Sequence, residues 1–152
     1  MNSKQTTATD TARIELIEAR AAIADLVHTY ARNIRAGCGA DCVKLFTEQA
    51  VFEVREAPLA SRETHRTRAR VVGHQAIMGY LVGSASSDVR VCPMIHNLLI
   101  RVDGREAESD CVMTAYVSNG QRLVGEYQDQ FRHDGGWRFS SRVFTILGGM
   151  GS

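Results

Sequence analysis

The chain has 152 residues and a formal net charge of +1, from 18 basic and 17 acidic side chains. This balance creates no overall field that would attract nucleic acid or a membrane surface. No apolar stretch approaches the roughly 20 residues of a membrane-spanning helix, and the polar start of the chain lacks the apolar core of a secretory signal. We therefore predict a disordered tail at 1–11, then one cytoplasmic domain at 12–148 with no nucleic-acid or membrane partner.

The four cysteines, Cys38, Cys42, Cys92 and Cys111, form no recognisable disulfide framework. Cys38 and Cys42 are close enough in sequence to suggest a metal clip. A structural zinc site normally takes four ligands at recognisable spacing, however, and the sequence has no second pair. Small thiols in a reduced, cytoplasmic chain explain these residues better, so we expect no metal ion.

The first half of the chain combines helical patterns with short strands. Apolar residues recur at helical spacing from about Asp10 to Arg35, which predicts an amphipathic helix with Asp10 or Thr11 as its N-cap. Gly37 is the expected end of this helix. The later segments predicted here are a short helix capped by Asp41, a strand at 51–55, a loop at 57–67, a strand at 68–72 and a third helix at 73–81.

Four long strand patterns fill the second half, at about 89–102, 106–118, 123–133 and 136–147. Helices followed by a run of antiparallel strands define an α+β class. A four-residue turn at 133–136 would place Asp129 opposite Ser140. The same register makes Asp129 diagonal to Arg138 and Arg142. Because surface ion pairs are common, we expect a structural pair there rather than a catalytic one.

Five short motifs follow one another between about residues 14 and 146. In chain order they are Ala-Asp-Leu-Val-His-Thr-Tyr at 24–30, Leu-Phe-Thr-Glu-Gln-Ala at 45–50, Gly-His-Gln-Ala-Ile at 73–77, His96-Asn97 before Val-Asp-Gly at 102–104, and Gly-Glu-Tyr-Gln-Asp at 125–129 with Gly-Gly-Trp-Arg-Phe at 135–139. Together they resemble the SnoaL-like group of the nuclear transport factor 2-like (cystatin-like) superfamily. The resemblance implies a cone-shaped fold, in which a strongly bent antiparallel sheet wraps around N-terminal helices and encloses an apolar pocket.

Members of this superfamily include ketosteroid isomerases, scytalone-type and bile-acid dehydratases, polyketide cyclases and epoxide hydrolases. Other members only bind ligands or proteins, so the fold alone does not define a reaction. Sheets of this kind often pack face to face. The resemblance therefore also implies a homodimer or a higher homo-oligomer.

His96 is the first candidate for chemistry. It lies between apolar residues of a predicted strand, and an imidazole titrates near neutrality, so it can take a proton from one atom and return it to another. The resemblance agrees, because dehydratases of the superfamily use a histidine on a comparable strand. The alternative is a core histidine held by hydrogen bonds, and a bulge near Pro93 would reverse the face on which His96 lies.

Tyr30 lies at the centre of the first helix's apolar stripe, and Asn33 follows one turn later on the same face. By resemblance, Tyr30 would polarise a substrate carbonyl or hold a water; otherwise its ring packs and its hydroxyl bonds the backbone. Many members carry an acid five residues after this tyrosine, where this chain has Arg35. Asp110 could replace that acid and orient the imidazole of His96, unless it is simply an exposed residue.

We predict a cofactor-independent lyase or isomerase, such as a dehydratase, isomerase or cyclase, acting on an apolar cyclic substrate of the steroid or polyketide type. In this hypothesis His96 is the general acid/base, Tyr30 polarises the substrate and Asp110 orients the imidazole. Asn33 is the predicted polar contact to the substrate, and the predicted apolar walls of the pocket are Phe46, Phe52, Met78, Met113 and Phe139.

Two other interpretations remain open. The first is a non-catalytic ligand-binding or assembly module, which Arg35 in place of the usual acid favours. The second is an epoxide hydrolase, which would need a cluster such as Arg101, Asp103 and Asp129 around a water. The basic segment at 62–70 is expected to be a solvated edge, although it could attract a carboxylate or a coenzyme A tail at the mouth of the pocket.

Overall fold

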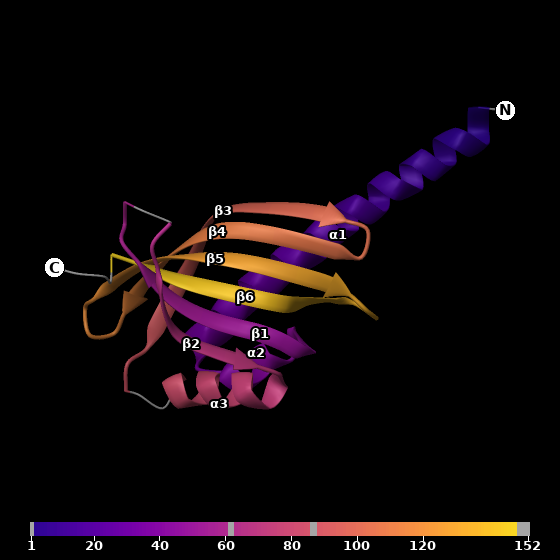
Figure 1. Ribbon diagram of the computed structural model, residues 1–152. Coiled ribbons are helices and arrows are strands. Elements are labelled where there is room, and N and C mark those ends of the chain that lie inside the picture. The colour runs from indigo at the N-terminus through magenta and orange to yellow at the C-terminus, as the bar shows by residue number, and fades with distance from the viewer. Residues whose placement is uncertain (1, 61–62, 86–87, 149–152) are drawn as a thin grey trace.

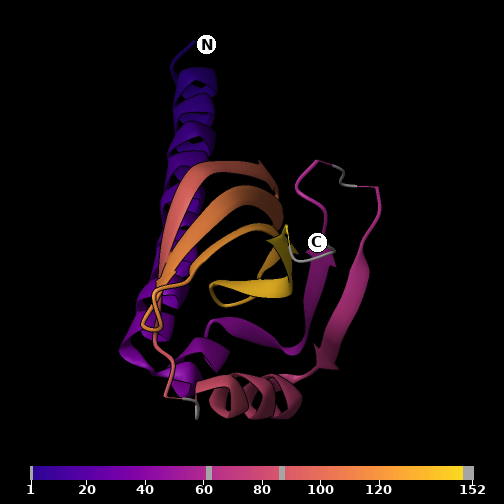
Figure 2. The ribbon, with the colours of Figure 1, turned by 90° about the vertical axis from the view of Figure 1, so that its left-hand side faces the viewer.

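The computed structural model describes residues 2–60, 63–85 and 88–148. Its elements, in chain order, are α1 (Asn2–Ala36), α2 (Gly39–Val43), β1 (Phe46–Ala57), β2 (Arg66–Val72), α3 (His74–Ala85), β3 (Val91–Asp103), β4 (Glu106–Val117), β5 (Arg122–His133) and β6 (Trp137–Leu147). One bent sheet curves around one side of α1, as Figures 1 and 2 show. None of the described helices is long and apolar enough to cross a membrane.

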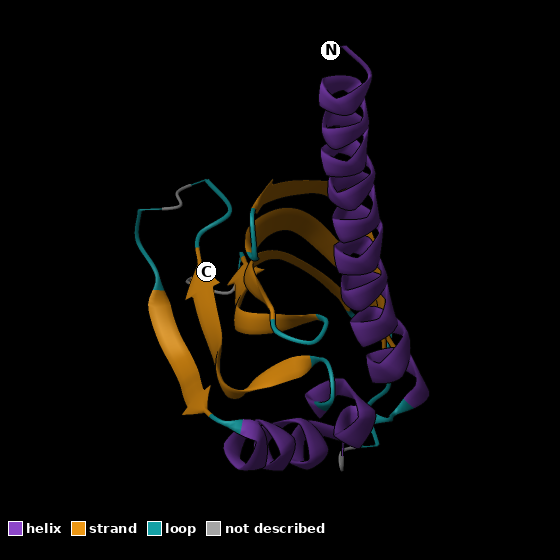
Figure 3. Ribbon diagram, turned by 90° about the vertical axis from the view of Figure 1, so that its right-hand side faces the viewer, coloured by secondary structure: helices purple, strands orange, loops and turns teal. Residues whose placement is uncertain are grey.

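The predicted α+β class is confirmed, and the sheet is mixed rather than purely antiparallel. Its six strands run in the order β2-β1-β6-β5-β4-β3. The pairing of β1 with β6 is parallel, whereas the other neighbouring strands are antiparallel. The two short helices α2 and α3 lie near the C-terminal end of α1 (Figure 3), so the three helices together cover one end of the bent sheet.

Helix α1 begins at Asn2, earlier than the start predicted at Asp10 or Thr11. The segment 2–36 contains no glycine or proline, so the helix can continue outward from its packed half without a break. It ends where predicted, because Gly37 has a left-handed φ of 74° and its N–H donates to the carbonyl of Ile34. Figure 1 shows that the N-terminal half of α1 projects beyond the sheet.

The core lies between the C-terminal half of α1 and the inner face of the sheet. From α1 it takes Ile23, Val27 and Tyr30, which are at most 3% exposed. Aromatic rings from the sheet fill the rest, and Phe131 and Phe139 contact each other at a centroid distance of 4.9 Å. Each fully buried side chain of this size stabilises the fold by about 1.5–3 kcal/mol, so the apolar filling fixes α1 against the sheet.

The register predicted for the last hairpin is wrong. His133 pairs with Trp137, and a bulge after Gln130 shifts the pairing so that Asp129 lies directly opposite Arg142 instead of Ser140. The extra residue of a bulge reverses the face of every side chain beyond it. As a result both Asp129 and Arg142 point inward, and the ion pair expected at the surface is buried in the core.

A second bulge decides which face of the sheet His96 occupies. His96 pairs with Val112 and Leu99 with Asp110, so two residues of β3, Asn97 and Leu98, oppose one residue of β4. Asn97 has a φ of 53°, a left-handed conformation that asparagine tolerates better than most residues. Side chains directly opposite each other share a face, so His96 and Asp110 both lie on the outer face of the sheet.

The left-handed backbone at this bulge gives a first prediction. Asn97→Val should lower the free energy of unfolding by about 1–2 kcal/mol, because a β-branched residue is strained at positive φ. Asn97→Gly should leave stability close to that of the wild type. Urea unfolding followed by circular dichroism measures both, with Leu99→Val at a 63% exposed neighbouring site as the control. Equal stability of the valine and glycine variants at position 97 would contradict the strained backbone.

Candidate functional site

An apolar pocket of about 420 Å³ opens between the C-terminal half of α1, α3 and the inner face of the sheet. Its apolar walls include Phe52, Val54, Leu81, Met113, Phe144 and Ile146. Its polar groups are three tyrosines, one serine and one arginine: Tyr30, Tyr80, Tyr127, Ser84 and Arg68. A few polar groups on a largely apolar wall are typical of a small-molecule site.

Two larger hollows lie elsewhere on the molecule. One, of about 830 Å³, separates α1 from the turns at Gly104 and Gly136, and the other, of about 810 Å³, follows the outer face of the sheet. Charged side chains such as Glu15 and Glu18 in the first, and Arg70 and Glu108 in the second, are prominent in their walls. The smaller pocket is the better candidate because its walls are mostly apolar.

Tyr30 and Tyr127 are two buried tyrosines that line the pocket. Their rings meet edge to face at a centroid distance of 6.2 Å, and the residues are 3% and 6% exposed. Burial raises the pKa of Tyr127 to about 12 and raises the pKa of Tyr30 well above its ordinary value. Both hydroxyls therefore stay protonated at neutral pH and can donate hydrogen bonds to a bound molecule.

A fully buried guanidinium lies behind the two tyrosines. The Cζ atom of Arg142 is 3.6 Å from the ring centroid of Tyr127, 4.2 Å from that of Tyr30 and 4.7 Å from that of Phe139. A cation over a desolvated aromatic ring is stabilised by about 2 kcal/mol or more. These contacts fix both tyrosine rings against one cation.

The partner of this cation is Asp129, which is 2% exposed. Its Oδ1 atom lies 3.5 Å from Nε of Arg142, too far for a good hydrogen bond. Ser109 is opposite Asp129 on β4. Within the described residues, the buried side-chain oxygen and nitrogen atoms of Ser109, Asp129 and Arg142 have no hydrogen-bond partner. Burial raises the pKa of Asp129 to about 7, against the opposing effect of the Arg142 charge.

The structure brings together only part of the predicted site. Tyr30, Phe52 and Met113 all line the pocket. Phe46 and Phe139 are completely buried, and their ring centroids lie 6.1 and 6.2 Å from that of Tyr30. They therefore pack against a residue of the pocket wall without lining the pocket themselves. Asn33 and Met78 lie outside this wall; Asn33 is half-buried on α1, and Met78 is 40% exposed on α3.

His96 and Asp110 are on the other side of the sheet from Tyr30. The Nε2 atom of His96 lies 2.7 Å from the hydroxyl of Thr114, and the side chain is exposed. Asp110 accepts a hydrogen bond of 2.6 Å from Nη2 of Arg101. The structure therefore separates this imidazole and this carboxylate from the apolar pocket. The physical reason for His96 is the bulge at Asn97, which pairs it with the outer-face residue Val112 instead of Met113.

The cluster considered for an epoxide hydrolase does not form. Arg101 donates to Glu108 and Asp110 on the exposed outer face, while Asp129 is buried on the inner face. No group of three histidine, cysteine, aspartate or glutamate side chains in the described ranges is arranged to hold a metal ion.

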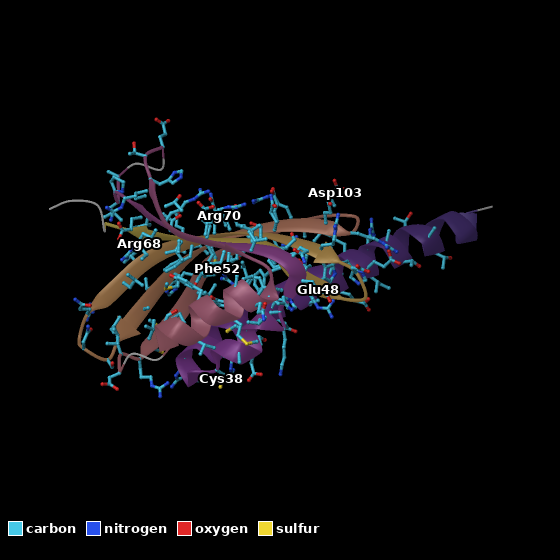
Figure 4. All side chains as sticks on the ribbon, turned by 60° about the horizontal axis from the view of Figure 1, so that its bottom comes forward. Cys38, Glu48, Phe52, Arg68, Arg70 and Asp103 are labelled. Carbon is cyan, nitrogen blue, oxygen red and sulfur yellow. The ribbon has the colours of Figure 1, made fainter. Side chains whose placement is uncertain are left out.

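Tyr127, Arg142 and Arg68 belong to the site and were not among the predicted site residues. Tyr127 alternates with Asp129 and Phe131 along β5, a pattern that indicates one shared face. Arg142 had no such signal, because arginine is rarely buried. Arg68 reaches the pocket mouth from β2, where it forms an ion pair of 2.9 Å with Glu56; Figure 4 shows it with Arg70 on β2 and Phe52 on β1.

A bent sheet around a helix, with an apolar pocket between the inner face of the sheet, α1 and α3, defines the class of cone-shaped α+β folds. The SnoaL-like domain family matches residues 15–143, and the chain belongs to this family. A search of curated proteins gives no significant match.

Solved structures from Novosphingobium aromaticivorans are similar over most of the chain. The β subunit of a putative aromatic-ring-hydroxylating dioxygenase has a TM-score of 0.72 at 15% identity, covering 88% of this chain and 92% of its own. An NTF2-like protein with a cystatin-like fold has a TM-score of 0.70 at 20% identity, covering 98% and 93%. A putative scytalone dehydratase has a TM-score of 0.68 at 23% identity, covering 91% and 87%. These similarities show the cystatin-like fold.

The buried carboxyl group gives a second prediction. The pKa of Asp129 is raised from 3.8 to about 7, so the folded protein keeps a proton that the unfolded chain releases. This contribution to stability is present below about pH 4 and is lost as the pH rises toward 7, with a limiting slope of about 1.4 kcal/mol per pH unit. Asp129→Asn should abolish this loss, because the amide imitates the protonated acid.

Urea unfolding of the wild type and of Asp129→Asn between pH 4 and 8 measures the difference in slope. Asp110→Asn is the control, since the side chain of Asp110 is 48% exposed on the outer face and its substitution should change the slope little. A wild type and an Asp129→Asn variant with parallel stability curves would show that Asp129 titrates alike in both states.

Proposed function

We propose that this protein binds an apolar, ring-containing small molecule in the 420 Å³ pocket and holds one oxygen atom of that molecule with Tyr30 and Tyr127. The volume lies within the range of roughly 300–1,000 Å³ usual for small-molecule sites. The observation that carries the proposal is the pair of buried, protonated tyrosines, Tyr30 and Tyr127, in a largely apolar wall. A steroid or polyketide skeleton has this combination of apolar rings and few oxygens.

Binding without catalysis is favoured by the composition of the pocket wall. In the described part of the chain, that wall contains no carboxylate and no imidazole, and its one charged residue is Arg68. Proton-transfer catalysis usually relies on a group whose pKa lies near the working pH. The raised pKa values of Tyr30 and Tyr127 make them hydrogen-bond donors rather than bases.

A second candidate is a lyase or isomerase: a dehydratase, isomerase or cyclase. The observation in its favour is Arg142, whose guanidinium touches the rings of Tyr30 and Tyr127 and makes both hydroxyls better donors toward an oxygen that gains negative charge. The similarity to a putative scytalone dehydratase supports the same class. Acid/base roles for His96 and Asp110 gain no support from their place on the outer face.

We further propose a cytoplasmic protein that forms homo-oligomers and uses no cofactor. Four free thiols support a reducing compartment: Cys38, Cys42, Cys92 and Cys111.

The binding proposal predicts that removing the hydroxyl group of Tyr30 weakens the binding of an oxygen-containing ligand. 2-Tetralone, an apolar bicyclic ketone, should bind the wild type, and Tyr30→Phe should weaken it by about tenfold, the equivalent of one hydrogen bond. The hydrocarbon tetralin, which lacks the oxygen, should bind both proteins equally. Isothermal titration calorimetry measures the affinities, with Tyr116→Phe at a 54% exposed site as the control.

An equal loss of affinity for the ketone and for the hydrocarbon would indicate damage to the pocket. Unchanged affinity for both compounds would contradict the role of Tyr30. Exchange of the ketone's α-protons in D₂O separates the second candidate from the first, because only an enzyme of the isomerase type accelerates it. Acceleration that His96→Ala abolishes would restore the acid/base hypothesis for this histidine.

A further inference from the structure

The projecting half of α1 carries an apolar stripe that the described residues of the chain leave uncovered. Ile14 is 54% exposed and Ile17 is 67% exposed. Ala21, also exposed, and Ala24, half-buried, continue the stripe toward the sheet. The spacing of three and four residues between these positions places them on one face of the helix, as in the a and d positions of a heptad.

This stripe points away from the protein's own core. The residues by which α1 packs on the sheet, Ile23, Val27 and Tyr30, lie on another side of the helix, because successive residues turn by about 100°. Figures 2 and 3 show that the N-terminal end of α1 extends past the sheet. No residue of the described segments covers Ile14 or Ile17, which are more than half exposed.

Charges of opposite sign flank the stripe in a regular way. If Ile14 and Ile17 take heptad positions a and d, Arg13 and Arg20 take position g on one flank, and Glu18 and Asp25 take position e on the other flank. All four charged side chains are exposed. None of them forms an ion pair with another residue of the described segments.

This charge pattern favours a second copy of α1 as the partner of the stripe, with the two helices parallel. In a parallel pair of identical helices, flank g of one meets flank e of the other, so Arg13 would face Glu18 of the partner subunit, and Arg20 would face Asp25 of the partner subunit. In an antiparallel pair, like flanks meet, which would set arginine beside arginine and acid beside acid. Opposite charges at e and g positions direct pairing, whereas like charges oppose it.

We infer that the stripe of Ile14, Ile17, Ala21 and Ala24 binds the same stripe of a second copy of this chain, with the two α1 helices parallel. Ala21 and Ala24 let the helix axes approach closely near the two domains. The helix is already formed in each copy, because its C-terminal half is anchored in the core, so association does not have to fold it. The apolar contact is short, and the pairing is therefore reversible and depends on concentration.

The first experiment measures the mass of the full chain by light scattering after size-exclusion chromatography over a range of concentrations. Ile14→Glu/Ile17→Glu should break the α1 pair and so lower the average mass below that of the wild type at the same concentration. Leu16→Glu, on another face of the same helix and 44% exposed, should leave the mass unchanged. A wild type that stays monomeric, or a mass unaffected by the double substitution, would overturn the inference.

Charge substitutions test the flanks. Arg13→Glu/Arg20→Glu should weaken association by at least about tenfold, because like charges would meet across the pair. Adding Glu18→Arg/Asp25→Arg should restore it, since the four changes exchange the two flanks. Because each of these variants alters only exposed side chains, circular dichroism should report the same helix content in all of them. If the fourfold variant did not regain the association of the wild type, the proposed pairing of the flanks would be contradicted.

A disulfide cross-link tests whether the two α1 helices are parallel. In a Cys38→Ser background, which removes the exposed native thiol, Ala21→Cys should form an intermolecular disulfide with its own counterpart under mild oxidation. Ala12→Cys, at an exposed site on the opposite face of α1, is the matched control and should not form an intermolecular disulfide. Parallel helices bring identical positions of the stripe together, so equal cross-linking at both sites, or at neither, would overturn the parallel arrangement.

Discussion

A guanidinium enclosed by aromatic rings is the constraint on which the cone depends. Removing a charge from water costs several kcal/mol, and only close contacts inside the protein offset that cost. Arg142 finds these contacts on Tyr30 of α1, Tyr127 of β5 and Phe139 of β6. Each ring comes from a different element. Loss of any one of them would leave part of the buried charge unstabilised, so the helix and two strands are held in one relative position.

The pocket is built on this arrangement. The same two tyrosines that contact the cation also form part of the pocket wall, so their orientation toward a ligand is set from behind rather than by the ligand. Asp129 completes the buried pair, and its raised pKa shows that the balance between charge and burial is close. A site supported in this way is preorganised, because its polar groups are already held before a molecule binds.

The sequence was sufficient for the order of the elements and for the fold family, because apolar periodicity and five ordered motifs agree with each other. Tyr30, predicted to polarise a substrate, and Phe52 and Met113, predicted as apolar walls, lie in the wall of the 420 Å³ pocket. The side of the sheet on which a residue lies was harder to predict, since the bulges beside Phe131 and Asn97 add residues that alternation alone does not reveal. Arg142 escaped prediction because its burial depends on rings that are distant in sequence.

The bulge in β3 also bears on how this family can change its chemistry. His96 is an outer-face residue because the bulge pairs it with Val112, and its neighbour Ile95 faces inward opposite Met113. Deleting Pro93 or Met94, with Cys92 still paired to Tyr116 and Leu99 to Asp110, would remove the bulge and place His96 opposite Met113 on the inner face. An imidazole on the inner face beside Met113, a residue of the pocket wall, is thus one deletion away.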